Sequence, residues 1–167
     1  ENAKTELILD PEKKILLILG GSSGARSINQ TACSLAKDAS EFAEDWQIVH
    51  IAGHSDYQRI KDFYADAPIA ATVLEYYDNM ADLLAASSLA IGRSGAVSVA
   101  EYAAAELPTI CMPYPHHKDL HQYRNAGKLV EINAAVIVDD LPDENQRRQW
   151  FREELFRLLR DDSLREK

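Results

Sequence analysis

The chain has 167 residues, of which 46% are hydrophobic and 27% are charged, and its formal net charge is −9. This length and composition are typical of one soluble α/β domain that buries a sizeable core. The acidic balance disfavours broad binding to nucleic acid or to an anionic membrane surface, because both require clustered Lys and Arg. No apolar run in the sequence is long enough to span a bilayer. Cys33 and Cys111 stand far apart without metal-binding or redox spacing, so we expect buried free thiols in a reducing cytosol.

The hydrophobic pattern predicts six strands that alternate with helices, preceded by a polar lead-in over residues 1–12 that lies outside the core. Strands are expected at residues 13–19, 47–52, 72–76, 89–91, 109–112 and 135–138. Helices are expected from residue 25, over residues 57–64, 80–86, 97–106 and 120–131, and from residue 141. Strands joined by short helical crossovers predict a Rossmann-like, doubly wound parallel sheet with helices on both faces. We therefore expect one α/β domain over residues 1–167, with ligands bound beyond the carboxyl ends of the strands.

The first predicted strand ends in the small-residue turn Gly20-Gly-Ser-Ser-Gly24, which opens the first helix. Glycines let a phosphate approach the backbone closely, so Gly21 and Ser22 are candidate phosphate contacts. The turn is neither Gly-x-Gly-x-x-Gly nor a P-loop, and Ala52 ends the second strand where a dinucleotide site would have a ribose-binding acid. A nicotinamide or flavin cofactor is therefore disfavoured, and a purely structural glycine turn is the alternative to a phosphate loop.

A second strand-to-helix turn, over residues 91–101, has the same small-residue character and carries Arg93 and Glu101. Free backbone N–H groups and the positive end of the helix dipole favour an anion at such a turn. Glu101 lies two turns along the helix, where its carboxylate can accept both hydroxyls of a ribose, or it is a surface charge. Arg93 either pairs with a phosphate or braces the turn through Asp78 or Asp82.

The loop after the fifth predicted strand gathers polar side chains over His116-His-Lys-Asp119, followed by His121 and Gln122. A polar cluster of this kind is typical of a loop that binds a polar ligand. His117 and His121 are four residues apart and could share one helix face around a metal, but no Cys or Glu stands nearby to complete a ligand set. No Ser-His-Asp or Cys-His pattern indicates a nucleophile, and His50 is expected to be an ordinary strand residue.

Taken together, these loops resemble those of the MurG family of N-acetylglucosaminyltransferases, in order and at the family's spacing, from about Lys14 to Val138. The motifs that carry the resemblance are Gly20-Gly-Ser-Ser-Gly-Ala-Arg26 with Asn29, Tyr77-Asp-Asn-Met80, Arg93-Ser-Gly-Ala96 with Glu101, Leu107-Pro108 and Pro115-His-His-Lys-Asp-Leu-His-Gln-Tyr-Arg-Asn-Ala126. The resemblance implies the C-terminal, donor-binding domain of a GT-B glycosyltransferase. It also implies that the acceptor domain and any general base lie before Glu1, so the catalytic base is unknown.

The resemblance further implies roles in binding UDP-GlcNAc. The backbone at Tyr77 would read uracil, and the Glu101 carboxylate would hold the ribose. The glycine loop at Ser22 would face the diphosphate, the Arg93 turn would support the nucleotide, and Gln122 would reach the hydroxyls of GlcNAc. The full set of donor-binding positions implied by the resemblance is Gly21, Ser22, Tyr77, Arg93, Ser94, Gly95, Ala96, Glu101, His117, Lys118, Asp119 and Gln122.

The implied reaction is inverting transfer of GlcNAc from UDP-GlcNAc to the lipid-linked muramyl-pentapeptide (lipid I) of peptidoglycan synthesis, which makes lipid II. No metal or cofactor is implied, since helix dipoles and loop N–H groups can stabilise the departing UDP. The resemblance places the parent enzyme in the cytoplasm, peripheral on the inner face of the plasma membrane, with membrane contact through its other domain. Nucleic acid is not an expected partner. This chain alone is expected to bind donor without turnover.

Four positions depart from the family pattern, and two alternative functions stay open. Ser23, Asn79, Glu106 and His121 stand where the family commonly has Gln, an acid, Gly and Gln. His121 touches the implied sugar pocket and therefore bears on specificity for GlcNAc. The alternatives are a UDP-sugar epimerase or hydrolase of the same fold, and a non-catalytic nucleotide-binding subunit of a split glycosyltransferase.

Overall fold

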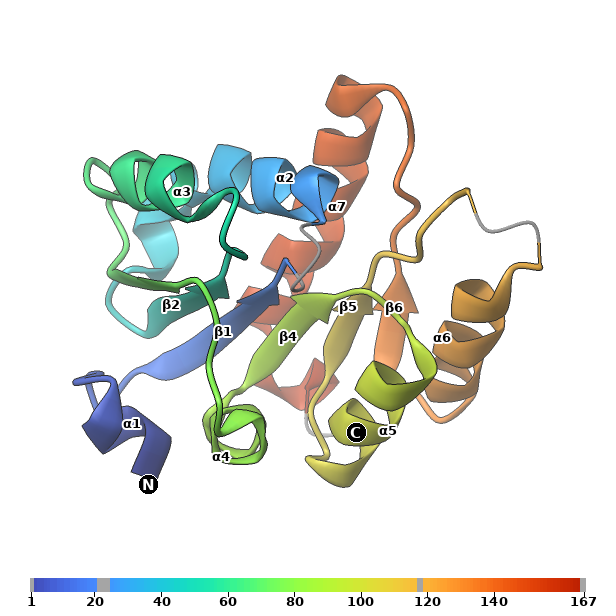
Figure 1. The fold of residues 1–167 in the computed structure, drawn as a ribbon, viewed down its shortest axis with the longest axis horizontal. Helices are drawn as coiled ribbons and strands as arrows, with labels where there is room; N and C mark the ends of the chain where they lie inside the picture. The colour runs from blue at the N-terminus through green and yellow to red at the C-terminus, as the bar shows by residue number, and fades with distance from the viewer. Residues whose placement is uncertain (1, 21–24, 117–118, 166–167) are drawn as a thin grey trace.

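The protein is built on one six-stranded sheet, and the computed structural model describes residues 2–20, 25–116 and 119–165 (Figure 1). The strands are β1 (Lys14–Leu19), β2 (Trp46–Ile51), β3 (Ala71–Leu74), β4 (Leu89–Gly92), β5 (Thr109–Cys111) and β6 (Ala135–Ile137). All neighbouring pairs are parallel, and the order across the sheet is β3-β2-β1-β4-β5-β6. This is the strand order of the Rossmann fold, so the predicted doubly wound parallel sheet is confirmed.

Helices cover both faces of the sheet (Figure 1). One face is covered by α2 (Arg26–Ala36), α3 (Tyr57–Tyr64) and α7 (Glu144–Arg160), with the short 3-10 helices η1 (Ala39–Phe42) and η2 (Asp162–Leu164) near it. The other face is covered by α1 (Asn2–Glu6), α4 (Met80–Ala86), α5 (Ala96–Ala104) and α6 (His121–Glu131). Because every helix from α2 to α6 follows a strand, each of them begins at the carboxyl edge of the sheet.

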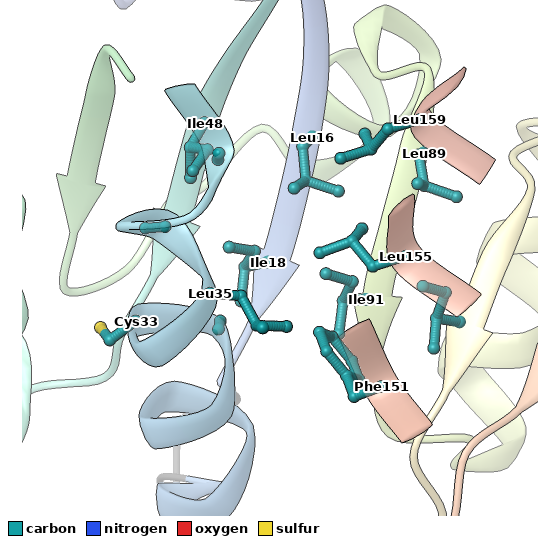
Figure 2. Packing of buried hydrophobic residues seen from close by; sticks show 14 of the residues in the cluster. Leu16, Ile18, Cys33, Leu35, Ile48, Leu89, Ile91, Phe151, Leu155 and Leu159 are labelled. Carbon is teal, nitrogen blue, oxygen red and sulfur yellow. The ribbon is translucent and has the colours of Figure 1, made fainter. Parts of the chain in front are cut away.

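The central strand β1 is buried on both faces, which explains its unbroken apolar sequence. Leu16 and Ile18 point to the face covered by α2 and α7, where Leu35 and Leu155 pack near them (Figure 2). Leu17 alternates to the opposite face and joins the second core cluster. The two cores on either side of β1 fix the positions of the loops at its carboxyl end.

The first twelve residues differ from the lead-in that the sequence predicts. Helix α1 packs against α4, and its Ala3 is fully buried. Farther along, the Gln47 side chain holds the backbone of Asp10, because its Oε1 accepts from the Asp10 N–H at 3.0 Å and its Nε2 donates to the Asp10 carbonyl at 2.7 Å. The expectation that this segment lies outside the core is therefore wrong, since one small residue suffices to seat a short polar helix.

Two predicted helix ends also differ, and local backbone chemistry explains both. The last helix begins at Glu144 instead of residue 141, because the Asp143 carboxylate accepts a hydrogen bond from the N–H of Gln146 at 2.9 Å and caps it. The helix predicted over 97–106 ends at Ala104, and Glu106 takes a left-handed conformation with φ of 51° that stops it.

Candidate functional site

The candidate site lies where the strand order reverses, between β1 and β4 (Figure 1). Chain crossovers leave β1 toward one face and β4 toward the other, so the turns that follow the two strands separate at the carboxyl edge of the sheet. Such a separation opens a crevice that commonly binds ligands in doubly wound proteins. The turn after β1 starts at Gly20, and the turn after β4 runs from Gly92 to Gly95.

Close packing requires glycine at the start of the first turn. A Cβ on Gly20 would lie 2.1 Å from Oδ1 of Asn29 and 3.0 Å from the carbonyl oxygen of Ile51. The Gly20 carbonyl accepts a hydrogen bond from the N–H of Ala25, which closes the turn onto the start of α2. Among the described residues, no side chain caps the start of helix α2, because its N-cap residue is Ala25. The predicted phosphate contacts Gly21 and Ser22 lie outside the described residues.

A buried polar network around Asn29 packs against this turn. Asn29 donates through Nδ2 to the carbonyl of Ala52 at 3.0 Å and to the carboxylate of Asp56 at 2.8 Å. Its Oδ1 therefore accepts from Nε2–H of His50 at 3.0 Å, which leaves Nδ1 of His50 to accept from the Tyr64 hydroxyl at 3.1 Å. Burial lowers the pKa of His50 to about 3, so the ring is neutral. This network was not predicted from the sequence, although a His inside an apolar strand was a signal for it.

The second turn is tied to α6. Ser94 is fully buried, and its Oγ donates to the carbonyl of Gln122 at 2.8 Å. The Asn125 side chain donates in return to the carbonyl of Ser94 at 3.1 Å. The Ser94 hydroxyl is thus used inside the protein, and the predicted contact with a nucleotide would have to come from the backbone of this turn.

Gly92, which opens the second turn, leaves room for a tyrosine. A Cβ there would lie 2.4 Å from the hydroxyl oxygen of Tyr102 and 3.3 Å from the Cβ of Leu19. The Tyr102 hydroxyl donates to the carbonyl of Arg93 at 3.2 Å, which fixes the direction of the turn. Helix α5 then begins after Gly95 without a side-chain cap.

Arg93 braces the turn, although not through the partners that the sequence suggested. Its guanidinium donates to the carbonyls of Met112 at 2.7 Å and Pro113 at 3.3 Å, at the end of β5. It also donates to Oγ of Ser27 at 3.0 Å and to the buried carboxylate of Asp140 at 2.8 Å. The proposed braces Asp78 and Asp82 are therefore wrong, because the guanidinium reaches across the crevice to α2 and to the loop after β6.

A pocket of about 420 Å³ opens between the starts of α5 and α6. Its lining residues are Gly95, Ala96, His121, Gln122 and Asn125. The structure thus brings together three of the predicted donor-binding positions, namely Gly95, Ala96 and Gln122. The starts of α5 and α6 both border this pocket, and the N-cap residue of each helix makes no side-chain cap.

The entrance to α6 orients two of the pocket side chains. Oε1 of Gln122 accepts from the N–H of Tyr114 at 2.9 Å, which leaves the NH2 group of its amide to serve as a donor. His121 pairs with Asp119, with 2.9 Å between Nε2 and Oδ2. The predicted contacts His117 and Lys118, and with His117 one member of the metal pair considered from the sequence, lie outside the described residues. Among the described residues, no group of three or more His, Cys, Asp or Glu could hold a metal ion.

Glu101 and Tyr77 stand apart from the pocket lining. Glu101 is exposed on α5, and within the described part of the chain its carboxylate has no hydrogen bond or ion pair. Tyr77 is buried after β3, and its hydroxyl donates to the carboxylate of Glu6 at 2.8 Å, which raises the Tyr77 pKa to about 12. Its side chain is thus engaged with α1, so a ligand contact at Tyr77 would have to use the backbone.

None of the helices in the described segments combines the length and the apolar sequence that a membrane span requires.

Comparison with known proteins identifies the family. The family model described as the glycosyltransferase family 28 C-terminal domain matches residues 15–146. The chain belongs to this family. Together with the names of the curated relatives, this match confirms the resemblance to the MurG family, and it extends from the second residue of β1 to the start of α7.

Several curated relatives of this family 28 domain carry the name UDP-N-acetylglucosamine–N-acetylmuramyl-(pentapeptide) pyrophosphoryl-undecaprenol N-acetylglucosamine transferase. The relative from Haemophilus ducreyi is 41% identical over 140 residues, covering 84% of this chain and 38% of the relative. The relative from Corynebacterium diphtheriae is 45% identical over 132 residues, covering 79% of this chain and 34% of the relative. The chain thus spans little more than a third of the length of these relatives.

Solved structures agree with the family 28 assignment. MurG of Acinetobacter baumannii superposes with a TM-score of 0.77 and 29% identity, covering 96% of this chain and 46% of that chain. A UDP-GlcNAc 2-epimerase from Neisseria meningitidis superposes with a TM-score of 0.68 at 16% identity, covering 99% and 40%, which shows a shared fold alone. The expected C-terminal GT-B domain is confirmed, and the epimerase alternative is not favoured because the relatives with high identity are named transferases.

Proposed function

We propose that this chain is the UDP-GlcNAc-binding domain of an inverting glycosyltransferase that transfers GlcNAc to lipid I and makes lipid II. The observation that carries the proposal is the pocket between the starts of α5 and α6, beside the strand reversal of a family 28 domain. The transferase name that relatives of 41% and 45% identity carry supports the choice of donor and acceptor.

The diphosphate of the donor is proposed to lie over the two glycine turns. In the described part of the chain, the N-cap residues of α2 and α5, Ala25 and Gly95, make no side-chain cap, so the first N–H groups and the dipoles of these helices are assigned to the anion. Gly21 and Ser22 belong to one turn, and Gly95 and Ala96 belong to the other. As the bond between the sugar and UDP breaks, these helix starts stabilise the growing negative charge on the leaving diphosphate, without need of a metal ion.

The uracil, ribose and GlcNAc groups of UDP-GlcNAc are assigned to residues on either side of the diphosphate. The exposed Glu101 carboxylate has free acceptor capacity for the two ribose hydroxyls, and the backbone at Tyr77 is assigned to uracil. The NH2 group of Gln122 is assigned as a donor to the GlcNAc hydroxyls, since the side-chain oxygen of Gln122 already accepts from the N–H of Tyr114. His121 lines the same pocket and is assigned to the sugar subsite.

The reaction needs groups that the remainder of the enzyme supplies. The acceptor hydroxyl O4 attacks the anomeric carbon from the side opposite UDP, its proton passes to a general base outside this chain, and UDP leaves with inverted stereochemistry at the sugar. The lipid-linked acceptor places the parent enzyme on the cytoplasmic face of the plasma membrane as a peripheral protein, and this chain by itself binds donor without transfer.

Calorimetric titration of the chain in EDTA tests the proposal. UDP-GlcNAc, UDP, UDP-glucose and NADH are titrated in parallel. We expect UDP-GlcNAc and UDP to bind, UDP-glucose to bind more weakly than UDP-GlcNAc, and NADH to give no signal. Release of free GlcNAc by the parent enzyme without acceptor would instead favour a hydrolase, and absence of any uridine nucleotide binding would contradict the proposal.

A further inference from the structure

A largely buried polar cluster joins four separate segments beside the crevice. Its members are Ser27 on α2, Arg93 in the turn after β4, Asp140 in the loop after β6, and Arg147 on α7. The side chains of Asp140 and Arg147 are 7% and 8% exposed, and that of Arg93 is 19% exposed. Buried charges require paired partners, so the relative positions of these segments are tightly specified.

Three of these side chains form a closed triangle of hydrogen bonds. The Ser27 hydroxyl donates to Oδ2 of Asp140 at 2.6 Å. Nη2 of Arg93 donates to Oγ of Ser27 at 3.0 Å and to Oδ2 of Asp140 at 2.8 Å. Since each member contacts the other two, movement of any one segment breaks two of the three bonds.

Arg147 fixes the carboxylate from the opposite side. Its Nη1 lies 3.6 Å from Oδ1 of Asp140 and donates to the carbonyl of Leu141 at 2.6 Å. Its Nε donates to Oγ1 of Thr31 at 3.1 Å, one helical turn beyond Ser27. Asp140 is therefore held by α7 and, through its other oxygen, holds the two walls of the crevice.

The triangle sets the distance between those two walls. Ser27 lies in the first turn of α2, which follows β1, and Arg93 lies in the turn that leads into α5, which follows β4. These strands stand on either side of the strand reversal, so the chain does not connect the two turns locally. A ligand that contacts both helix starts needs their spacing fixed before it binds, because ordering them on binding would reduce affinity.

We propose that Asp140 is a positioning residue for the diphosphate of the nucleotide, acting through Ser27 and Arg93 on the spacing between the starts of α2 and α5. The inference rests on the proposed function, because it assumes that a nucleotide diphosphate bridges these two helix starts. Uridine without phosphates contacts only one side of the crevice in this assignment, and its affinity does not depend on the spacing.

The neighbouring Asp139 supplies a matched control. Its carboxylate accepts from the Tyr123 hydroxyl at 2.9 Å and takes no part in the triangle. Asp139→Asn and Asp140→Asn change the net charge equally, one residue apart in the same loop. Any difference between them in nucleotide affinity therefore reports the specific contacts of Asp140 instead of the overall charge.

The experiment measures the affinities of UDP and uridine for the chain and its variants, with thermal unfolding of each variant to set a temperature at which it is folded. We expect Asp140→Asn to weaken UDP binding by roughly three- to thirtyfold, the range for residues that act through a contact network, while uridine affinity is unchanged. Asp139→Asn keeps the UDP affinity of the parent chain, that is, of the chain without a substitution. Ser27→Ala, which removes one corner of the triangle without changing charge, weakens UDP in the same direction and serves if Asp140→Asn does not fold.

The outcomes separate this inference from the proposed function. If the parent chain binds UDP and the ratio of UDP to uridine affinity is unchanged in Asp140→Asn and Ser27→Ala, the positioning role of Asp140 is wrong and the proposed function stands. An equal loss for UDP and uridine would also overturn it, since a general loss of structure affects both ligands. If the parent chain binds no UDP, the proposed function fails and the inference fails with it.

Discussion

Acidification should destabilise this domain through one histidine. His50 is fully buried on β2, and desolvation lowers its pKa from 6.5 to about 3; the negative charge of Asp56 opposes this shift by a smaller amount, and the positive charge of Arg59 adds to it. The unfolded chain therefore binds a proton between these two pKa values that the folded chain does not bind. The stability contributed by the neutral ring is complete above pH 6.5 and is lost as the pH falls toward 3.

The size of the effect follows from the two pKa values of His50. Linkage between a folded pKa of about 3 and an unfolded pKa of 6.5 gives a loss of about 2 kcal/mol in the free energy of unfolding between pH 7 and pH 5. For a domain of this size, this corresponds to a decrease in melting temperature of roughly 4–8 °C. The exposed His54 acts in the opposite direction, because Glu75 raises its pKa.

Urea unfolding at pH 7, 6 and 5 measures the effect, with His54→Gln as the background that removes the opposing titration. His50→Gln in that background keeps a donor for Asn29 and has no titrating ring. We expect this variant to be less stable at pH 7 by about 1 kcal/mol, through imperfect hydrogen bonds, and to lose less stability on acidification. Equal pH dependence with and without His50 would refute the reasoning.

Two further predictions concern packing and the nucleotide. Gly92→Ala should destabilise the domain by about 1–3 kcal/mol, because its Cβ would lie 2.4 Å from the hydroxyl oxygen of Tyr102. Gly127→Ala is the control, because no atom lies within 4 Å of the Cβ that it adds. Equal urea midpoints for the two variants would contradict the packing argument. Glu101→Ala should weaken UDP binding by about 1–3 kcal/mol with little change in melting temperature, because the carboxylate is exposed in the free chain. Glu131→Ala is the control with the same charge change on α6, and equal UDP affinity of the two variants would remove Glu101 from the site.

The sequence predicted the sheet well because its signals are local. The apolar run of β1 reflects burial on both faces, and glycine turns mark the ends of β1 and β4. By contrast, helix α1 has too few apolar residues to show a helical period. Its burial depends on α4, which lies far along the sequence.

The candidate site was predicted in its turns and missed in its supports. Motif spacing indicated Gly95 and Gln122, which line one pocket. The partner of Arg93 could not be found in this way, because Asp140 lies 47 residues later and meets it through the order of the strands. The same holds for Asn29 and His50, which come from an adjacent helix and strand and whose pairing depends on the tertiary structure.

Mapping of UDP binding on the backbone amides by NMR tests the central claim most directly. The 15N-labelled chain is titrated with UDP, and the chemical shift of each assigned backbone amide is followed. We expect the largest changes at the starts of α2 and α5, at Glu101 and at Gln122, with little change at residues 132–136 on the opposite, amino edge of the sheet. Changes concentrated at that opposite edge, or spread evenly over the domain, would contradict a nucleotide site at the strand reversal.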